Sequence, residues 1–197
     1  FNHVREMGCW LISDEVYHQI MFNDNVSPSL LQLSKPTDKL IVINSASKSF
    51  NMTGWRIGWI THPEELGPHI AKLVQITTTG VPEFLQNGLI SALQNYKLIT
   101  KEVRQNLKKS RDIMFQRLVE WKRVECSVPE AAFYAFFKVK DVKDSLEFAK
   151  KLIIDTNVGV APGIAFGESG EGHLRICFAA KQSFINKIMD RLEPAFN

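Results

Sequence analysis

Three short polar segments of this sequence combine side chains that could do chemistry on a carbonyl compound. They are Asp14–Tyr17, Ser45–Lys48 and the residues around Arg56. Lys48 follows an apolar run and is flanked by small residues, and a desolvated lysine loses its proton more readily and can attack a carbonyl carbon. The three segments therefore indicate a ligand site built around an amine, with carboxylate, hydroxyl and guanidinium groups beside it.

Each of these side chains also has a purely structural interpretation. Asp14 could cap the helix that it precedes, Lys48 could lie in a surface turn, and Arg56 could form a structural ion pair. The occurrence of all three at these spacings favours a site. Ser45–Lys48 also fits the SxxK motif of serine β-lactamases, which would make Ser45 an acylated nucleophile. The SDN and KTG motifs that accompany SxxK do not follow it, so this alternative is rejected.

The elements that must position these groups are short apolar strands. Cys9–Ile12 and Leu40–Asn44 are continuous apolar runs, which suit strands buried on both faces of a parallel sheet. Trp55–Ile60 alternates well enough to be a third strand. Ligands bind beyond the carboxyl ends of strands in open α/β sheets, so Asp14 and the small polar turn Ser45–Ser47 are expected at the binding edge.

Helices are predicted around and after these strands, from apolar residues at helical spacing. The predicted helices are a first one ending at Gly8, Glu64–Thr77, Pro82–Leu93, and a long one that Thr100 caps and that reaches Trp121. From about residue 122 the pattern is α+β, with strands at Phe133–Val139 and Leu174–Phe178, and helices around Leu146–Ile153, with Asp144 near the start, and Phe184–Leu192. The predicted domains are part of a large α/β domain over residues 1–98, a connecting helix over 99–122 and a small α+β domain over 123–197.

Composition excludes several classes of function. The 197 residues are 45% hydrophobic and 23% charged, as in soluble globular proteins, and the formal charge of +3 predicts neither a nucleic-acid groove nor a membrane surface. No run approaches the roughly 18 apolar residues of a membrane span. Cys9, Cys126 and Cys177 form no CxxC pair and are expected to be reduced, mostly buried thiols of a cytoplasmic protein. The histidines lack metal-site spacing, so no metal is expected.

The glycines at 167, 170 and 172 raise the question of a phosphate loop. Their spacing is GxxGxG, and they come before a predicted strand rather than after one. They therefore fail the dinucleotide-binding fingerprint, and a flexible turn is predicted instead.

Four segments resemble successive motifs of the class I and II aminotransferases of pyridoxal-phosphate (PLP) fold type I. They are Ile12–Tyr17 (ISDEVY), Ser45–Phe50 (SASKSF), Met52–Gly58 (MTGWRIG) and Gly172–Ile176 (GHLRI). They occur in the family's order and at roughly its spacing, and they cover nearly the whole chain. The fold that the resemblance implies is α/β: the C-terminal part of the fold type I large domain, with a mixed, mainly parallel sheet, plus a small α+β domain.

The resemblance implies roles for the residues nearest the cofactor ring. Lys48 would hold PLP as a Schiff base, and its amine, once freed, would move the proton between the substrate α-carbon and the cofactor. Asp14 would keep the pyridine nitrogen protonated. Tyr17 would donate a hydrogen bond to the ring 3-oxygen.

It also implies how the charged ends of cofactor and substrate would be held. Ser45 and Ser47 would hydrogen-bond the phosphate, and Arg56 would give it a charged fork. Arg175 would clamp the substrate α-carboxylate in a bidentate manner and orient its Cα–H bond over the lysine.

The implied activity is transfer of an amino group between an amino acid and a 2-oxo acid, in a homodimer whose shared sites lie near Thr78–Gly80. Two alternatives remain: a PLP-dependent C–S lyase, and the aminotransferase-like effector domain of a transcription regulator. Met52–Arg56 favours transamination. In the family, the glycine-rich phosphate loop, the aromatic residue that stacks on the ring and the asparagine partner of the 3-oxygen lie upstream of position 1. The chain is therefore expected to be a fragment.

Overall fold

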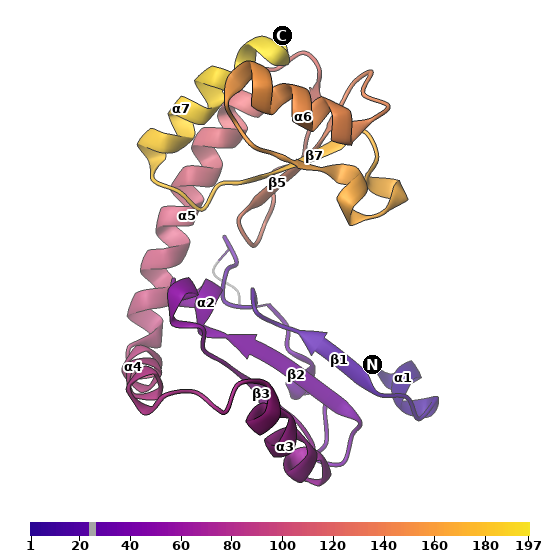
Figure 1. Ribbon diagram of the computed structural model, residues 1–197, viewed down its shortest axis with the longest axis vertical. Helices are drawn as coiled ribbons and strands as arrows, with labels where there is room; N and C mark the ends of the chain where they lie inside the picture. The colour runs from indigo at the N-terminus through magenta and orange to yellow at the C-terminus, as the bar shows by residue number, and fades with distance from the viewer. Residues whose placement is uncertain (24–26) are drawn as a thin grey trace. The chain divides into compact units, whose positions relative to one another are not determined.

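The computed structural model describes residues 1–23 and 27–197. The chain divides into two compact units of similar length, Phe1–Val103 (unit 1) and Arg104–Asn197 (unit 2). Each unit contains both strands and helices, as Figure 1 shows. Among the described residues, no helix combines the length and the apolar character that crossing a membrane requires.

Unit 1 is built on a three-stranded sheet with the order β1-β2-β3. β1 (Leu11–Asp14) runs parallel to β2 (Leu40–Ser45), and β3 (Gly58–Thr61) runs antiparallel to β2. β2 is central, and its side chains alternate between buried and half-buried positions. The central strand is therefore the apolar run that the sequence predicts, with both neighbours hydrogen-bonded to it.

The first and third strands differ from their predictions. The prediction that the first strand spans Cys9–Ile12 and is buried on both faces is wrong, because β1 begins at Leu11 and Ile12 is 62% exposed. β1 is an edge strand, and the described residues leave the face that carries Ile12 uncovered. The third strand begins at Gly58 because Thr53–Trp55 forms a 3-10 turn (η2) and Arg56 has a left-handed φ of 52°.

Short helices surround the sheet of unit 1. α1 (Asn2–Glu6) precedes β1 and ends before Gly8, whose φ of 66° is typical of a helix-terminating glycine, as predicted. α3 (Gly67–Thr77), which follows the 3-10 turn η3 (Glu64–Leu66), and α4 (Glu83–Gln94) confirm the two predicted central helices. A further 3-10 turn, η1 (Leu30–Gln32), lies between β1 and β2.

The long helix α5 (Tyr96–Leu118) starts earlier than predicted. Thr100 is not its cap: the residue lies inside the helix, and its hydroxyl donates a hydrogen bond to the carbonyl of Tyr96 at 2.7 Å. Such back-bonding within one turn satisfies a threonine hydroxyl in a helix interior. Trp121, which was predicted to lie on this helix, follows its end and is buried.

Unit 2 is built on a four-stranded antiparallel sheet with the order β4-β5-β7-β6. β5 (Tyr134–Val139) and β7 (His173–Cys177) are its central pair and confirm the two predicted strands. The short strands β4 (Val124–Glu125) and β6 (Ala161–Pro162) were not predicted, because two residues give no periodic signal.

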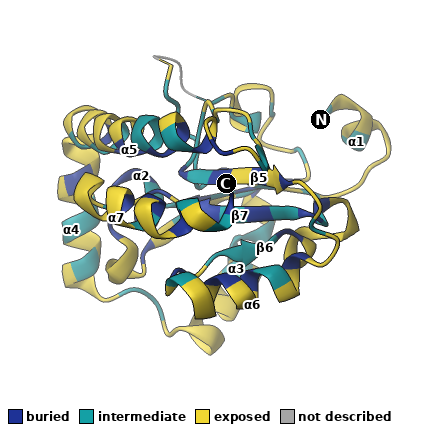
Figure 2. Ribbon diagram, turned by 90° about the horizontal axis from the view of Figure 1, so that it is seen from above, coloured by how far each residue is buried: buried dark blue, intermediate teal, exposed yellow. Residues whose placement is uncertain are grey.

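Two helices of unit 2 match the sequence closely. α6 (Ser145–Thr156) begins after Asp144, whose carboxylate accepts a hydrogen bond from the Glu147 amide at 2.9 Å and so caps the helix. α7 (Gln182–Leu192) buries Ile185, Met189 and Leu192. Figure 2 shows that α6 and α7 are exposed on their outer sides and buried towards the strands. The core of unit 2 therefore lies between one face of its sheet and these helices.

Candidate active site

The polar segments of unit 1 meet at one edge of its sheet. Asp14 and Ser45 are the last residues of the parallel strands β1 and β2, so both lie at the carboxyl edge. Because β3 is antiparallel, its first residue, Gly58, pairs with Ser45, and Arg56 lies two residues before that pair. Sheet topology thus collects all three segments where ligands bind in α/β proteins.

The segment after β1 places two acidic side chains in different surroundings. Asp14 is exposed, and Oδ1 of its carboxylate accepts a hydrogen bond from the Val16 amide at 3.2 Å. Glu15 is 9% exposed, and its Oε1 accepts hydrogen bonds from the Leu30 amide (2.9 Å) and the Ser13 hydroxyl (3.2 Å). Glu15 therefore links the end of β1 to Leu30 by a hydrogen bond, while Asp14 is exposed to solvent. Sequence reasoning placed both in one polar segment and missed the structural role of Glu15.

Lys48 lies on α2 (Ala46–Ser49), a single helical turn that follows the end of β2, where the sequence predicted a small polar turn. Ser45 is its N-cap: the Ser45 hydroxyl accepts a hydrogen bond from the Ser47 amide at 3.1 Å and donates to the Ile57 carbonyl at 3.4 Å. Ser47 is buried and Lys48 is half-buried. The Lys48 amine lies 6.0 Å from the centre of the Tyr17 ring, so the segments after β1 and β2 face each other.

A small apolar cluster supports α2 and the turn that follows it. Its buried members are Ala46, Phe50, Met52, Ile57 and Ala92, with Trp59, Val81, Leu85, Leu89 and Ile99 packed around them. The amides of Phe50 and Met52 both donate to the carbonyl of Ala46, at 3.2 and 3.4 Å. The backbone that carries Lys48 is therefore stabilised by this apolar cluster and by the two hydrogen bonds to Ala46.

Arg56 ends the turn η2 in a left-handed conformation, with φ 52° and ψ 46°. One end of its guanidinium, Nη1, donates to the carbonyl of Thr53 at 2.9 Å, and the side chain is exposed. The neighbouring Trp55 packs on Gly88 of α4, where a Cβ would overlap the indole ring. This contact fixes the turn that presents Arg56, with the rest of its fork directed outwards.

Arg175, the remaining predicted site residue, belongs to unit 2. It lies on β7 opposite Phe136 of β5 and Ala161 of β6. Its guanidinium carbon is 4.4 Å from the centre of the Tyr134 ring and 4.1 Å from that of Phe166. The structure thus brings the other predicted residues to one edge of unit 1, and it places Arg175 in an aromatic setting on unit 2.

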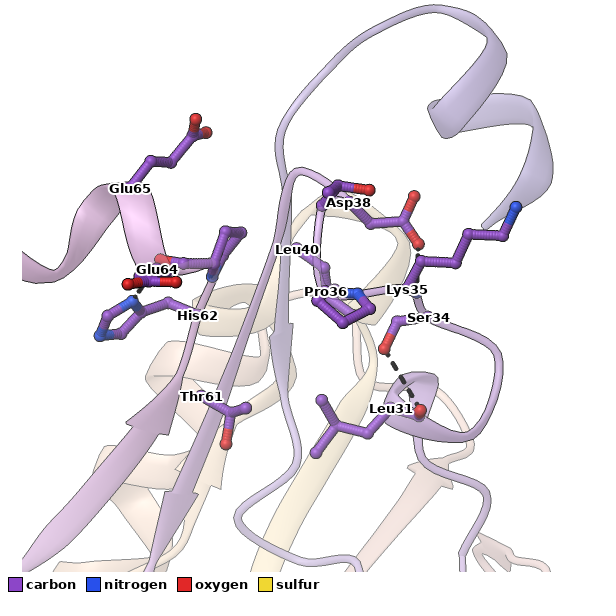
Figure 3. Close-up of a pocket in the computed structure, with 12 residues that line it drawn as sticks. Leu31, Ser34, Lys35, Pro36, Asp38, Leu40, Thr61, His62, Glu64 and Glu65 are labelled. Atoms are coloured by element: carbon purple, nitrogen blue, oxygen red, sulfur yellow. Dashed lines mark hydrogen bonds between the residues drawn. The ribbon is translucent and has the colours of Figure 1, made fainter.

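A cavity in unit 1 lies at the opposite end of the sheet from Lys48. Its volume is about 570 Å³, and its wall includes Leu40 at the start of β2 and Thr61 at the end of β3, with His62, Glu64 and Glu65 around it (Figure 3). None of the predicted site residues lines it. The chemistry-bearing side chains therefore identify the candidate site better than cavity volume does.

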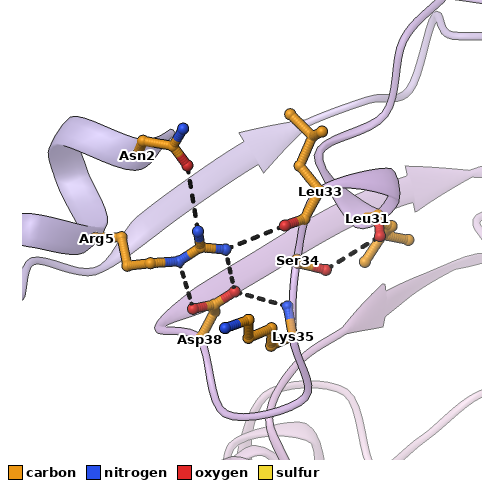
Figure 4. A network of polar contacts seen from close by, with 7 residues as sticks. All are labelled: Asn2, Arg5, Leu31, Leu33, Ser34, Lys35 and Asp38. Atoms are coloured by element: carbon orange, nitrogen blue, oxygen red, sulfur yellow. Dashed lines mark hydrogen bonds and ion pairs between the residues drawn. The ribbon is translucent and has the colours of Figure 1, made fainter.

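The same end of the sheet carries an ion pair (Figure 4). Arg5 of α1 forms a two-point contact with the Asp38 carboxylate, at 2.8 Å from Nε and 2.7 Å from Nη2. This hydrogen-bonded guanidinium, aided by the Lys35 amide at 2.7 Å, lowers the pKa of Asp38 to about 2. The pair fastens α1 to the loop before β2.

The exposure of the cysteines gives a further test of the sequence predictions. All three cysteines are free, and the expectation that they are mostly buried is wrong, because Cys9 and Cys177 are exposed. Both lie outside the apolar cores, Cys9 before β1 and Cys177 on the outer face of β7. Within residues 1–23 and 27–197, no cluster of three His, Cys, Asp or Glu residues could hold a metal ion.

Comparisons with known proteins give one consistent result. Residues 1–192 match the family described as "Aminotransferase class I and II". The chain is 32% identical over 186 residues to the aspartate aminotransferase of Pyrococcus abyssi, covering 93% of the chain and 48% of that protein. It is 34% identical over 187 residues to the LL-diaminopimelate aminotransferase of Natranaerobius thermophilus, covering 95% and 48%.

Solved structures agree. The aromatic aminotransferase of Pyrococcus horikoshii OT3 superposes with a TM-score of 0.90 at 30% identity, covering 98% of this chain and 52% of that one. The chain therefore spans about half the length of the relatives that it matches.

Proposed function

The chain belongs to the class I and II aminotransferases, and from this membership we propose that the whole protein transfers an amino group between an amino acid and a 2-oxo acid, with PLP as its cofactor. Its fold is the C-terminal part of PLP fold type I. One observation carries the proposal: a half-buried lysine, Lys48, lies at the carboxyl edge of a sheet beside a phenol ring, with a carboxylate and a guanidinium on the adjoining segments.

The donor set of this edge fits PLP. The Lys48 amine suits covalent attachment of the cofactor's aldehyde, and the exposed Asp14 carboxylate suits its ring nitrogen. One nitrogen of the Arg56 guanidinium, Nη1, donates to the Thr53 carbonyl, and the other N–H groups would bind the phosphate. When bound, PLP supplies an electron sink for negative charge on the substrate α-carbon.

The phosphate and the ring oxygen would be held by hydroxyl groups. Ser47 and Ser45 would donate to the phosphate, and Ser45 would give up its long 3.4 Å hydrogen bond to Ile57 to do so. Tyr17 would donate to the ring 3-oxygen. A phenol and two hydroxyls at one sheet edge suit a ligand that presents several oxygen acceptors.

Two residues would act on the substrate. Arg175 would bind the α-carboxylate through paired N–H groups, which orients the Cα–H bond. The amine of Lys48, once freed from the cofactor, would accept the proton from the substrate α-carbon and deliver it to the cofactor, as general bases do in proton transfer. Substrate choice is proposed only as a class, an α-amino acid with its 2-oxo acid.

Organisation of the whole protein is proposed on the same basis. Residues 1–98 would belong to the PLP-binding large domain, 99–122 to the connecting helix and 123–197 to the small domain, and the two compact units support a division into two parts. We propose a homodimer, with Thr78–Gly80 near the neighbouring site. The three unpaired cysteines support a cytoplasmic protein.

Aminotransfer is favoured over the two alternatives. A C–S lyase and a transcription-regulator effector domain could each retain the lysine. The relatives reported above carry the names of aminotransferases, which supports transfer of the amino group.

The decisive experiment substitutes Lys48 in the full-length protein. Lys48→Ala should abolish the visible absorption band of the bound cofactor and its trapping by borohydride, and lower transamination by at least about 100-fold, the usual contribution of a general base. Lys72 is an exposed lysine on α3, and Lys72→Ala is the matched control. This variant should leave the absorption band, the borohydride trapping and the rate of transamination unchanged. An unchanged band in Lys48→Ala would exclude the assignment. Pyruvate and ammonia without conversion of the cofactor to its amino form would replace aminotransfer by lyase activity.

A further inference from the structure

The outer face of the sheet in unit 2 carries an arginine that packs against two aromatic rings. The guanidinium of Arg175 has its carbon 4.1 Å from the centre of the Phe166 ring and 4.4 Å from that of Tyr134. Both distances are well inside the roughly 6 Å at which a cation is attracted to a ring face. Arg175 is half-buried, whereas Phe166 is 46% exposed.

The pairing of β5 with β7 places the Tyr134 ring near Arg175. Phe136 of β5 pairs directly with Arg175, and Tyr134 pairs with Cys177, two residues farther along β7. Side chains two residues apart on a strand share a face, so Tyr134, Phe136 and Arg175 lie on the same side of the sheet. The alternate residues Ala135 and Phe137 are buried in the core on the other side.

Phe166 arrives from a different segment. It ends the 3-10 turn η4 (Gly163–Phe166), which packs against a second turn, η5 (Glu168–Gly170). Gly163 and Gly170 are both buried, and a Cβ on Gly163 would overlap the carbonyl oxygen of Gly170. The predicted flexible turn is thus a close-packed pair of turns, and this packing holds Phe166.

A second layer of rings supports Phe166. Phe136 meets Phe166 edge to face, with ring centres 6.0 Å apart at 89°, and stacks on His173 at 4.9 Å and 5°. Edge-to-face and stacked arrangements of this kind are favourable beyond the area that they bury. Phe166 is therefore held both by its backbone and by its neighbours.

Rings packed over a guanidinium occupy its face and leave the N–H groups at its edge for a ligand. An oxyanion that approaches in the guanidinium plane can be bound through both of its oxygens by two parallel N–H groups. The rings also restrict a long, flexible side chain before the ligand arrives, so less entropy is lost on binding. A planar carboxylate is the ligand that this geometry suits.

We propose that Phe166 and Tyr134 are positioning residues that hold Arg175 in one plane for the substrate carboxylate. The inference rests on the proposed function, because that function assigns the carboxylate to Arg175. It adds that carboxylate affinity depends on a ring at position 166. Neither ring needs to touch the reacting atoms.

The test uses full-length protein loaded with PLP and the amino acid that it converts fastest. Phe166→Leu removes the ring and keeps apolar volume, Phe166→Tyr keeps the ring, and Phe184→Leu on α7, where Phe184 is 57% exposed, is the matched control. Three quantities are measured: kcat and KM for the amino acid, the rate with the amine that lacks its carboxylate, and the calorimetric Kd of the carboxylic acid that lacks its amino group.

Phe166→Leu should raise the KM and the Kd by about 5- to 30-fold, the effect of losing a partly desolvated cation–π contact. The rate with the amine and the visible band should stay unchanged, and Phe166→Tyr and Phe184→Leu should behave as the wild type. An unchanged Kd in Phe166→Leu would overturn the inference, as would an equal loss with the amine, which would indicate a general structural role. Failure of the wild type to convert any amino acid would instead overturn the proposed function.

Discussion

Units 1 and 2 have similar lengths but very different interiors. Among the described residues, unit 2 buries more than twice as many hydrophobic residues as unit 1, including Phe137, Leu174, Phe178 and Met189 with essentially no exposure. Unit 1 exposes large apolar side chains on β1, α3 and α4, among them Ile12 at 62%, Ile76 at 82% and Phe84 at 71%. Large exposed apolar patches are typical of surfaces that bind another protein, a membrane or a ligand.

The two units therefore hold the residues of the proposed site in different ways. In unit 2 a closed core fixes the strands, and Arg175 is aligned by rings on the outer face of the sheet. In unit 1 a small apolar cluster packs against α2, which carries Lys48. We therefore expect substitutions in the core of unit 2 to act through folding, and those around α2 in unit 1 to act mainly through the site.

The largest effect on the free energy of unfolding should come from truncating a side chain in the core of unit 2. Leu174→Ala removes a fully buried side chain and should destabilise the chain by about 2–5 kcal/mol, measured by denaturant unfolding. Ile76→Ala in unit 1 should change the same quantity by no more than about 0.5 kcal/mol, because its side chain is 82% exposed. A cost above about 2 kcal/mol for Ile76→Ala in the full-length protein, but not in this chain, would show that the face is covered there. Equal costs in this chain would contradict the comparison.

A matched pair of glycine substitutions should have the next largest effect. In Gly163→Ala the new Cβ overlaps the backbone oxygen of Gly170 and lies 2.7 Å from that of His173, so about 3 kcal/mol of stability should be lost. In Gly88→Ala the Cβ meets only the ring of Trp55, which is 42% exposed and can move, so the loss should be about 1 kcal/mol.

The two glycine variants should also differ in their effect on PLP binding. Displacing Trp55 disturbs the turn that presents Arg56, so Gly88→Ala should weaken PLP binding by several-fold while leaving the binding of unphosphorylated pyridoxal unaltered. Gly159→Ala, whose Cβ meets nothing within 4 Å, serves as the control for both variants. Equal stability losses in Gly88→Ala and Gly163→Ala would contradict the distinction between side-chain and backbone contacts.

The smallest effects should be those of pH on two carboxylates, one in each unit. The Arg5 guanidinium lowers the pKa of Asp38 to about 2, and the Gly172 amide, with the hydroxyl and amide of Ser145, lowers the pKa of Glu171. A depressed pKa in the folded state means that the stabilisation is present above the unfolded value near 4 and is lost as the pH falls through the folded value.

Unfolding measured from pH 5 to pH 2 tests these contributions. Stability should fall over this range, and Asp38→Asn and Glu171→Gln should each make the fall less steep. Asp155→Asn, at an exposed position of α6, is a control that should leave the slope unaltered. A slope that neither Asp38→Asn nor Glu171→Gln changes would contradict both assignments.

Local signals account for the parts of the fold that were predicted well. β5, β7, α6 and α7 follow from periodic apolar residues and a capping aspartate, because each element's own residues alternate between core and solvent. The family itself follows from the motifs around Lys48 and Arg56, whose order is a property of the sequence alone.

Predictions that depended on distant residues succeeded less often. The exposure of Ile12 and Cys177 depends on which face of each sheet is covered by other elements. Those elements are distant in the sequence, so the residues next to Ile12 and Cys177 do not predict it. The helical turn at Lys48 follows from the Ser45 cap together with packing on Ile57 and Ala92.

The chemical groups of this protein, namely the lysine, carboxylate, hydroxyls and guanidinium groups, and their order along the chain can be read from the amino-acid sequence. The folded chain adds that an antiparallel β3 returns Arg56 to the edge that carries Ser45, and that Phe166 and Tyr134 pack against Arg175. The physical reason is that covalent order fixes the type of each side chain. Strand register and backbone packing between distant segments fix what that side chain touches.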